Sequence, residues 1–155
     1  MPNELLEELR QRKPFASLAQ EAYLSVARTQ AVLQAGLERV LKPHGVSLTQ
    51  YNVLRILRGA GPGGLCRHEV QDRLLTRMPD VTRLLDRMEE SGLVDRERGT
   101  VDRRLVTTRL TARGRELVDE LDAPIAAEHE RCLAHLGEDR LRELVGLLAL
   151  ARHPA

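Results

Sequence analysis

The chain has 155 residues, which is the usual size of one domain, and 42% of them are hydrophobic. Only three residues are aromatic, so the core must consist of leucine, valine and alanine, which favours helices over a β-sandwich. The 24 basic and 23 acidic residues leave a net charge of +1, which excludes the strongly basic composition that would by itself indicate nucleic-acid binding.

Membrane and secretory features are missing from the sequence. It has no apolar run approaching ~18 residues, and its first residues form an acidic amphipathic segment without the apolar stretch of a secretory leader. The two cysteines are too few for a disulfide framework. We therefore expect a cytoplasmic protein that does not associate with a membrane.

The first half of the chain has the apolar spacing of helices. The pattern predicts a short helix over residues 4–12 and a long one over residues 17–42. Ser47 and Gln50 have the spacing of a capping box, in which each side chain bonds the backbone amide of the other residue. They predict the start of a further helix, and the glycine-rich segment 59–64 predicts a turn after it.

Two short helices are predicted next. The first spans residues 67–75, with Cys66 at its N-cap, where a thiol should be a weaker acceptor than a hydroxyl. A three-residue turn leads to a second helix over residues 79–91, which opens on a proline, a residue suited to the first turn. Gly92 predicts a left-handed C-terminal cap.

The hydrophobic period then changes from 3.6 to 2. Residues 93–98 and 104–110 are predicted as two strands joined by a long hairpin loop. A long helix begins at Thr111, and a last helix spans residues 138–152. Helices that are apolar over a wide arc at both chain ends favour a subunit interface, with an ordinary intrachain core as the alternative.

The central segment has the order of a DNA-reading unit. Its first short helix can brace the second against the DNA backbone, the second can enter the major groove, and the hairpin tip can reach the minor groove. Between residues 96 and 109 there are five arginines and two acids, a local charge of +3, whereas six arginines and nine acids follow from residue 113. This asymmetry suits a localised phosphate contact. A solvated charged loop is the alternative.

Three runs of residues carry a resemblance to a known family. They are D-V-T-R-L-L-D-R-M-E-E-S-G-L-V-D-R-E-R at 80–98, D-R-R-L-V-T-T-R-L-T-A-R-G at 102–114 and L-T-Q-Y-N-V-L-R-I-L at 48–57. As a set they resemble the MarR family of bacterial regulators over about residues 20–150. The resemblance implies a homodimer with intertwined terminal helices and one winged helix-turn-helix per subunit. Family members are usually repressors, and many release DNA on binding a small, often phenolic, ligand or on cysteine oxidation.

The resemblance also assigns site residues. It implies that an arginine of the wing enters the minor groove while an aspartate orients an arginine there, which limits the freedom lost on binding. The alternative for Arg83 and Arg87 is an exposed helix face on which they pair with Asp80, Asp86 or Glu90. The DNA-binding residues expected from these considerations are Arg77, Thr82, Arg83, Arg87, Arg98, Asp102, Arg103 and Arg104.

Asp80 departs from the family pattern, in which small polar residues are common at this position. An acid near phosphates is repulsive, so we expect Asp80 to pair with Arg83 or Arg77, or to accept a bond from a cytosine amino group. The operator sequence is therefore not predicted.

Weaker signals concern thiols and metals. His129 and Cys132 share a helix face and could bind zinc, but His135 is rotated away, and we predict no metal site. Cys66 is the better candidate for a redox switch, because Arg67 and a helix N-terminus adjoin it. No catalytic motif, phosphate-binding loop or cofactor site is recognised.

We therefore predict a mainly α fold with a small β-hairpin wing. Residues 1–155 form a single domain, in which 1–45 and 111–155 provide the dimerisation helices and 46–110 the winged helix-turn-helix. The expected partners are a palindromic double-stranded DNA operator, a second copy of the chain and a small aromatic or phenolic effector. The alternatives are a winged helix that binds a protein partner and a metal- or thiol-responsive regulator.

Overall fold

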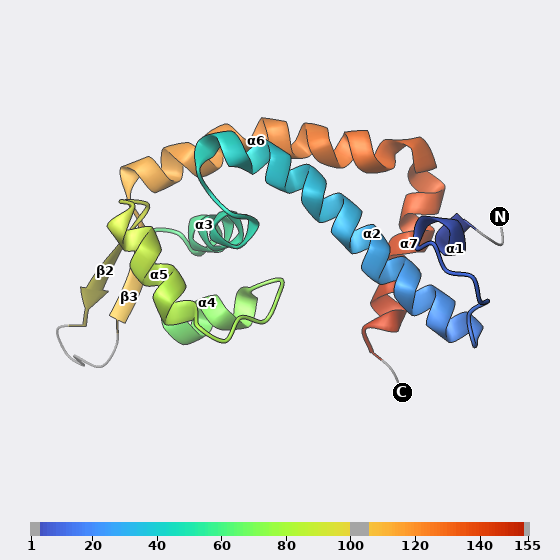
Figure 1. The fold of residues 1–155 in the computed structure, drawn as a ribbon. Helices are drawn as coiled ribbons and strands as arrows, with labels where there is room; N and C mark the ends of the chain where they lie inside the picture. The colour runs from blue at the N-terminus through green and yellow to red at the C-terminus, as the bar shows by residue number, and fades with distance from the viewer. Residues whose placement is uncertain (1–3, 100–105, 154–155) are drawn as a thin grey trace.

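The fold is that of a computed structural model, which describes residues 4–99 and 106–153 (Figure 1). It consists of helices and one small antiparallel sheet. In chain order the elements are α1 (Glu4–Glu8), α2 (Leu18–Leu41), a 3-10 turn (Lys42–His44), α3 (Leu48–Ala60), β1 (Leu65–Cys66), α4 (Arg67–Arg73), α5 (Val81–Glu90), β2 (Val94–Arg98), β3 (Val106–Leu110), α6 (Ala112–Leu133), a 3-10 turn (Ala134–Leu136) and α7 (Glu138–Ala151).

Two parts can be distinguished in Figure 1. The part from α3 to β3, called the head here, gathers the short helices and the sheet on the left of the view. The remaining helices α1, α2, α6 and α7 form the body. Helix α6 runs from the end of β3, along the top of the view, to α7, so one helix connects the head to the far end of the body.

Side-chain caps define where three helices begin. The capping box predicted before α3 is confirmed: the Gln50 amide donates to Ser47 Oγ at 3.2 Å, and the Ser47 amide donates to Gln50 Oε1 at 2.8 Å. Ser17 caps α2 and Thr111 caps α6, each by accepting a bond from the amide three residues later. The helix predicted over residues 4–12 is shorter, since α1 ends at Glu8.

The sheet has the order β1-β3-β2, with both pairings antiparallel. Strand β1 was not predicted, because it contains only two residues. Gly64 precedes it at φ 69°, and a Cβ atom there would lie 2.4 Å from the carbonyl oxygen of Thr108 on β3. The predicted hairpin is present, with Val94 opposite Leu110 and Arg98 opposite Val106.

The hydrophobic core of the head is completed by α6. Val118, Leu121 and Ile125 on that helix are at most 3% exposed. They belong to one buried cluster with side chains of the head, which include Val53, Leu54, Leu57, Val70, Val81, Leu84, Leu85, Met88 and Val94. The position of the head on the body is therefore tied to α6.

The body leaves large apolar side chains in contact with solvent. Leu18 is 80% exposed and Tyr23 is 75% exposed on α2, and Leu150 is 74% exposed on α7. Further exposed apolar residues of these helices are Val26, Val32, Val145 and Leu147. Among the described residues, no helix combines the length and hydropathy needed to cross a membrane.

Candidate nucleic-acid interface

Helix α5 begins at Val81 rather than at Pro79, so the predicted start of this helix was wrong by two residues. Asp80 is the N-cap: its carboxylate oxygen Oδ1 accepts a hydrogen bond from the Arg83 amide at 2.9 Å. Aspartate is among the preferred N-cap residues, so the type of Asp80 was the signal that could have identified this start. Its carboxylate bonds the helix backbone and not the side chain of Arg83 or Arg77, contrary to the predicted pairing.

The two faces of α5 differ sharply in exposure. Val81, Leu84, Leu85 and Met88 point into the core and are at most 5% exposed. The opposite face carries the side chains expected to meet DNA, and those of Thr82, Arg83 and Arg87 are all exposed. Arg77, in the turn before α5, is exposed as well.

The end of α5 is closed by the predicted left-handed glycine. Gly92 has φ 71°, its amide donates to the carbonyl oxygen of Glu89 at 2.9 Å, and the Leu93 amide donates to that of Met88 at 2.9 Å. These two bonds form a Schellman motif. The motif turns the chain directly into β2. Helix α5, the expected recognition helix, and the wing formed by β2 and β3 are therefore joined by a short, fixed connection.

An ion cluster that the sequence analysis missed connects α5 to the wing. The Arg96 guanidinium on β2 contacts Asp86 at 2.5 Å and Glu89 at 2.6 Å. Hydrogen bonds that Arg96 donates to Glu89, opposed by burial and aided by Asp86, raise the pKa of Arg96. Arg96 therefore offsets one of the two negative charges of Asp86 and Glu89 on α5 and is not available to phosphates, although it contributed to the local charge counted from the sequence.

A second arginine of the basic segment 96–109 also bonds other residues of the head. Arg109 on β3 contacts Glu97 on β2 at 2.5 Å, and its Nε donates to the carbonyl oxygen of Pro62 at 3.0 Å. It ties the hairpin to the turn before β1. Arg98 is exposed at the end of β2. Asp102, Arg103 and Arg104 lie outside the described residues.

The electrostatics of α5 follow from these contacts. Within residues 4–99 and 106–153, neither Arg83 nor Arg87 forms an ion pair. Two of their three candidate partners are occupied elsewhere, because Asp80 caps the helix and Asp86 contacts Arg96. The exposed face of α5 therefore presents two guanidinium groups to solvent, while Arg96 partly offsets the charge of the acids on the same helix, an arrangement suited to an external polyanion.

Helix α4 and the turn after it are held by two backbone contacts. The Cys66 amide donates to Glu69 Oε2 at 2.8 Å, and this bond lowers the pKa of Glu69. Cys66 is the N-cap, as predicted, and its half-buried thiol lies at the capping-box position opposite Glu69. The Leu75 amide donates to Asn52 Oδ1 at 3.0 Å. Asn52, not identified from the sequence, thus anchors the turn between α4 and α5 to α3.

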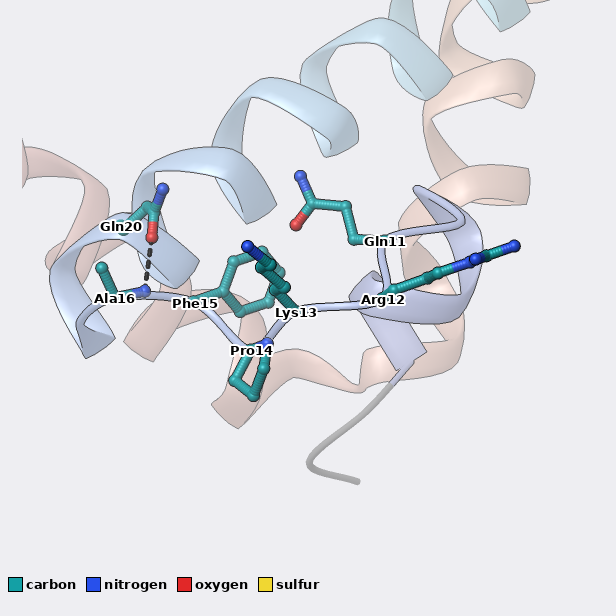
Figure 2. A pocket seen from close by; sticks show the side chains of 7 residues that line it. All are labelled: Gln11, Arg12, Lys13, Pro14, Phe15, Ala16 and Gln20. Carbon is teal, nitrogen blue, oxygen red and sulfur yellow. Dashed lines mark hydrogen bonds between the residues drawn. The ribbon is translucent and has the colours of Figure 1, made fainter.

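The body contains His129 and Cys132, the two residues that could suggest a metal site. In the described part of the chain, no three His, Cys, Asp or Glu side chains are placed to hold a metal ion, and Cys132 adjoins Glu128 and Arg131 instead. Figure 2 shows a shallow hollow of about 360 Å³ between α1 and the first turn of α2, with the ring of Phe15 and the side chain of Lys13 at its wall. It lies at the opposite end of the molecule from α5 (Figure 1).

A helix-turn-helix with an exposed basic face, followed by an antiparallel hairpin, defines the winged helix-turn-helix class of DNA-binding regulators. The family model described as MarR family matches residues 44–105. The HTH-type transcriptional regulator YkoM of Bacillus subtilis (strain 168) is 33% identical over 110 residues, which are 71% of this chain and 70% of that protein. The chain belongs to the MarR family, and it is a DNA-binding transcription regulator rather than an enzyme.

Solved structures agree with this assignment. A MarR transcription factor from Planctomyces limnophilus is 43% identical, with a TM-score of 0.68 over 88% of this chain and 98% of that one. The repressor CouR bound to a 23-mer DNA duplex is 26% identical, with a TM-score of 0.76 over 96% and 97% of the two chains. CouR from Rhodococcus jostii RHA1 bound to p-coumaroyl-CoA is 23% identical, with a TM-score of 0.74 over 91% and 98%, and shows the shared fold.

Proposed function

We propose that the protein is a homodimeric repressor whose two heads read the halves of a palindromic operator, and that a small-molecule effector releases it from DNA. The observation that carries this proposal is the exposed face of α5, where Arg83 and Arg87 form no ion pair within the described residues while Arg96 partly offsets the charge of Asp86 and Glu89. This face would lie in the major groove.

Different contacts with DNA are proposed for α5, for the turn before it and for the wing. Thr82, Arg83 and Arg87 would face base edges or nearby phosphates, and Arg77 would contact a phosphate of the flanking backbone. The wing would reach the minor groove, where a narrow groove attracts arginine; its proposed residues are Arg98, Asp102, Arg103 and Arg104. Binding would depend strongly on salt, since phosphate contacts release counterions.

The exposed apolar surface of the body supports the homodimer. Side chains as exposed as Leu18, Tyr23 and Leu150 are costly in contact with water, and burial against a second copy would remove this cost. In this proposal residues 1–45 and 111–155 form the dimerisation region and residues 46–110 the DNA-reading unit. A two-fold dimer presents two recognition helices to half-sites about one DNA turn apart.

The effector is proposed to be a small aromatic or phenolic compound. Support comes from CouR, which has been solved with p-coumaroyl-CoA and with DNA. The compound would bind between the body helices and the head and shift the separation of the two heads, which reduces affinity for a site of fixed spacing. Oxidation of the half-buried Cys66 thiol is an alternative trigger, because this residue is the N-cap of α4 and pairs with Thr107 on β3.

The test is gel retardation with the DNA upstream of the protein's own gene, with the oligomeric state measured by light scattering. Exchanging Arg83 and Arg87 for alanine should weaken binding at least about thirtyfold, at about 1–3 kcal/mol for each base contact, and should leave the dimer intact. Arg103 and Arg104 exchanged together should also weaken binding strongly.

The matched control replaces Arg140 and Arg142 by alanine, which removes the same charge from the body. Operator binding that is unchanged in the Arg83 and Arg87 variant would refute the interface. Binding of the wild type to a protein partner and to no duplex would favour the protein-interaction alternative.

A further inference from the structure

A second ion cluster lies where the head meets the body. Arg58, in the last turn of α3, donates from Nη1 to Asp122 Oδ2 at 2.8 Å and from Nη2 to Asp122 Oδ1 at 2.9 Å. The same Nη1 donates to Asp119 Oδ1 at 2.7 Å. Both aspartates belong to α6, so one guanidinium of the head holds two carboxylates of the helix that runs into the body (Figure 1).

The cluster is stronger than a lone surface pair. The Arg58 side chain is 25% exposed, and its fork bonds Asp122 in the bidentate geometry that gives charged hydrogen bonds their direction. Bonds to Asp122 and Asp119 raise the pKa of Arg58, and the bond from Arg58 lowers that of Asp122. Asp119 and Asp122 are three residues apart on one helix face, where like charges repel, and Arg58 offsets that repulsion.

Directional bonds are needed at this junction because its apolar contacts are not directional. Val118, Leu121 and Ile125 bury α6 against the head, and apolar burial is non-directional, so it does not by itself select one rotation of the head about the helix axis. The fork of Arg58 fixes that rotation, because both of its nitrogens must face Asp122 at once. Helix α5 extends from beside the start of α6 toward the lower part of the head (Figure 1), so a small rotation about α6 displaces the far end of the recognition helix.

We propose that Arg58 is a positioning residue that sets the separation of the two recognition helices and thereby the half-site spacing that the regulator accepts. The inference rests on the proposed homodimer. Adding or removing one base pair moves a half-site by about 3.4 Å along the DNA. A head whose rotation is fixed by Arg58 binds the altered site more weakly. A head without this bond can adjust its orientation and keep its affinity.

The experiment uses the full-length protein and a duplex selected by the wild type from a random library. Affinity is measured by fluorescence anisotropy for the selected operator and for versions with the centre lengthened or shortened by one base pair. We expect the wild type to bind the altered sites at least about thirtyfold more weakly, and Arg58→Gln to bind them within about fivefold of the selected one. Arg58→Lys, which keeps the charge but lacks the fork, should resemble Arg58→Gln.

A second variant separates geometry from charge and guards against misfolding of the first. Asp122→Asn changes the net charge in the opposite direction from Arg58→Gln, yet it breaks the same fork and should also relax the spacing preference. The control is Arg142→Gln, whose ion pair with Glu138 lies within α7 and which should keep the wild-type preference. Dimerisation and thermal unfolding are measured for each variant.

The outcomes distinguish the two hypotheses. If the wild type selects an operator and either folded, dimeric cluster variant keeps its spacing preference, the role of Arg58 is wrong while the proposed function stands. If the wild type selects no duplex at all, the proposed function fails and the inference fails with it.

Discussion

The guanidinium of Arg96 donates two hydrogen bonds to the carboxylate of Glu89, at 2.6 and 2.8 Å, and the Arg96 amide donates to the same carboxylate at 3.2 Å. Three bonds thus connect the recognition helix to the first strand of the wing. The pair has two consequences: it holds α5 and β2 as one unit, and it offsets negative charge on the helix that is proposed to face DNA. A change at Arg96 should therefore affect both stability and DNA binding.

Arg96→Gln is expected to lower the free energy of unfolding by about 1–2 kcal/mol, since it breaks part-buried charged hydrogen bonds. It should also weaken operator binding at least about tenfold at low salt, because Asp86 and Glu89 are left unneutralised beside the phosphates. Urea denaturation and fluorescence anisotropy measure the two effects. Arg28→Gln, which breaks an exposed pair with Glu8 in the body, is the control, and equal behaviour of the two variants would contradict the assigned role of Arg96.

Asp80 gives a prediction in which stability and DNA affinity respond separately. Asp80→Ala removes the cap of α5 and should cost about 1 kcal/mol of unfolding free energy. Asp80→Ser keeps a capping oxygen and removes a negative charge near the proposed phosphate contacts. It should retain wild-type stability and bind the operator more tightly, with the gain largest at low salt. A serine variant as unstable as the alanine variant would show that the cap is not what Asp80 contributes.

Gly114 is required by a close approach of two backbones. A Cβ atom at this position would lie 2.0 Å from the Leu93 carbonyl oxygen, between α6 and the start of β2. Gly114→Ala should therefore destabilise the protein by about 2 kcal/mol or more. Gly59→Ala, at a helical position of α3 with open space around it, should instead stabilise it by about 0.5–1 kcal/mol. Calorimetric melting of both variants tests this opposite sign.

The lowered pKa of Glu128 predicts that the free energy of unfolding depends on pH in the acid range. The carboxylate lies over Gly36 of α2, and hydrogen bonds from Arg131 lower the pKa of Glu128 from 4.5 to about 2. A depressed folded-state pKa contributes stability that is fully present above about pH 4.5 and is lost as the pH falls toward 2. Glu128→Gln should flatten the fall in stability between these values. Denaturation at pH 6 and pH 3 measures it, and an unchanged slope would contradict the pairing.

One variant of Cys66 tests both the N-cap of α4 and the proposed release of DNA on thiol oxidation. Cys66→Ser replaces the N-cap thiol, a weak hydrogen-bond acceptor, by a hydroxyl that accepts more strongly, so it should raise the unfolding free energy by about 0.5–1 kcal/mol. If oxidation of Cys66 releases DNA, the serine variant should remain bound after peroxide treatment that dissociates the wild type. Release of both proteins by peroxide would assign the response elsewhere.

Much of the fold could be predicted from short stretches of sequence. Apolar spacing indicated the helices, and the capping box of Ser47 and the left-handed Gly92 marked their ends. The strands followed from the change of hydrophobic period after Gly92. These signals are local, because each depends on residues within a few positions of one another in the chain. The family resemblance of 80–98 and 102–114 depends on the same local runs.

Only the tertiary structure shows which arginine side chains among the described residues of the head remain outside ion pairs. Arg96, Arg98 and Arg109 look equivalent in the sequence, yet Arg96 and Arg109 are bound to acids and only contacts across the folded head distinguish them. Arg58 and Asp122 are 64 residues apart, and no periodic pattern predicts that they meet. Ion pairs of this kind form where packed elements bring side chains together, so their partners are known only once α3, α5, β2 and α6 are in place.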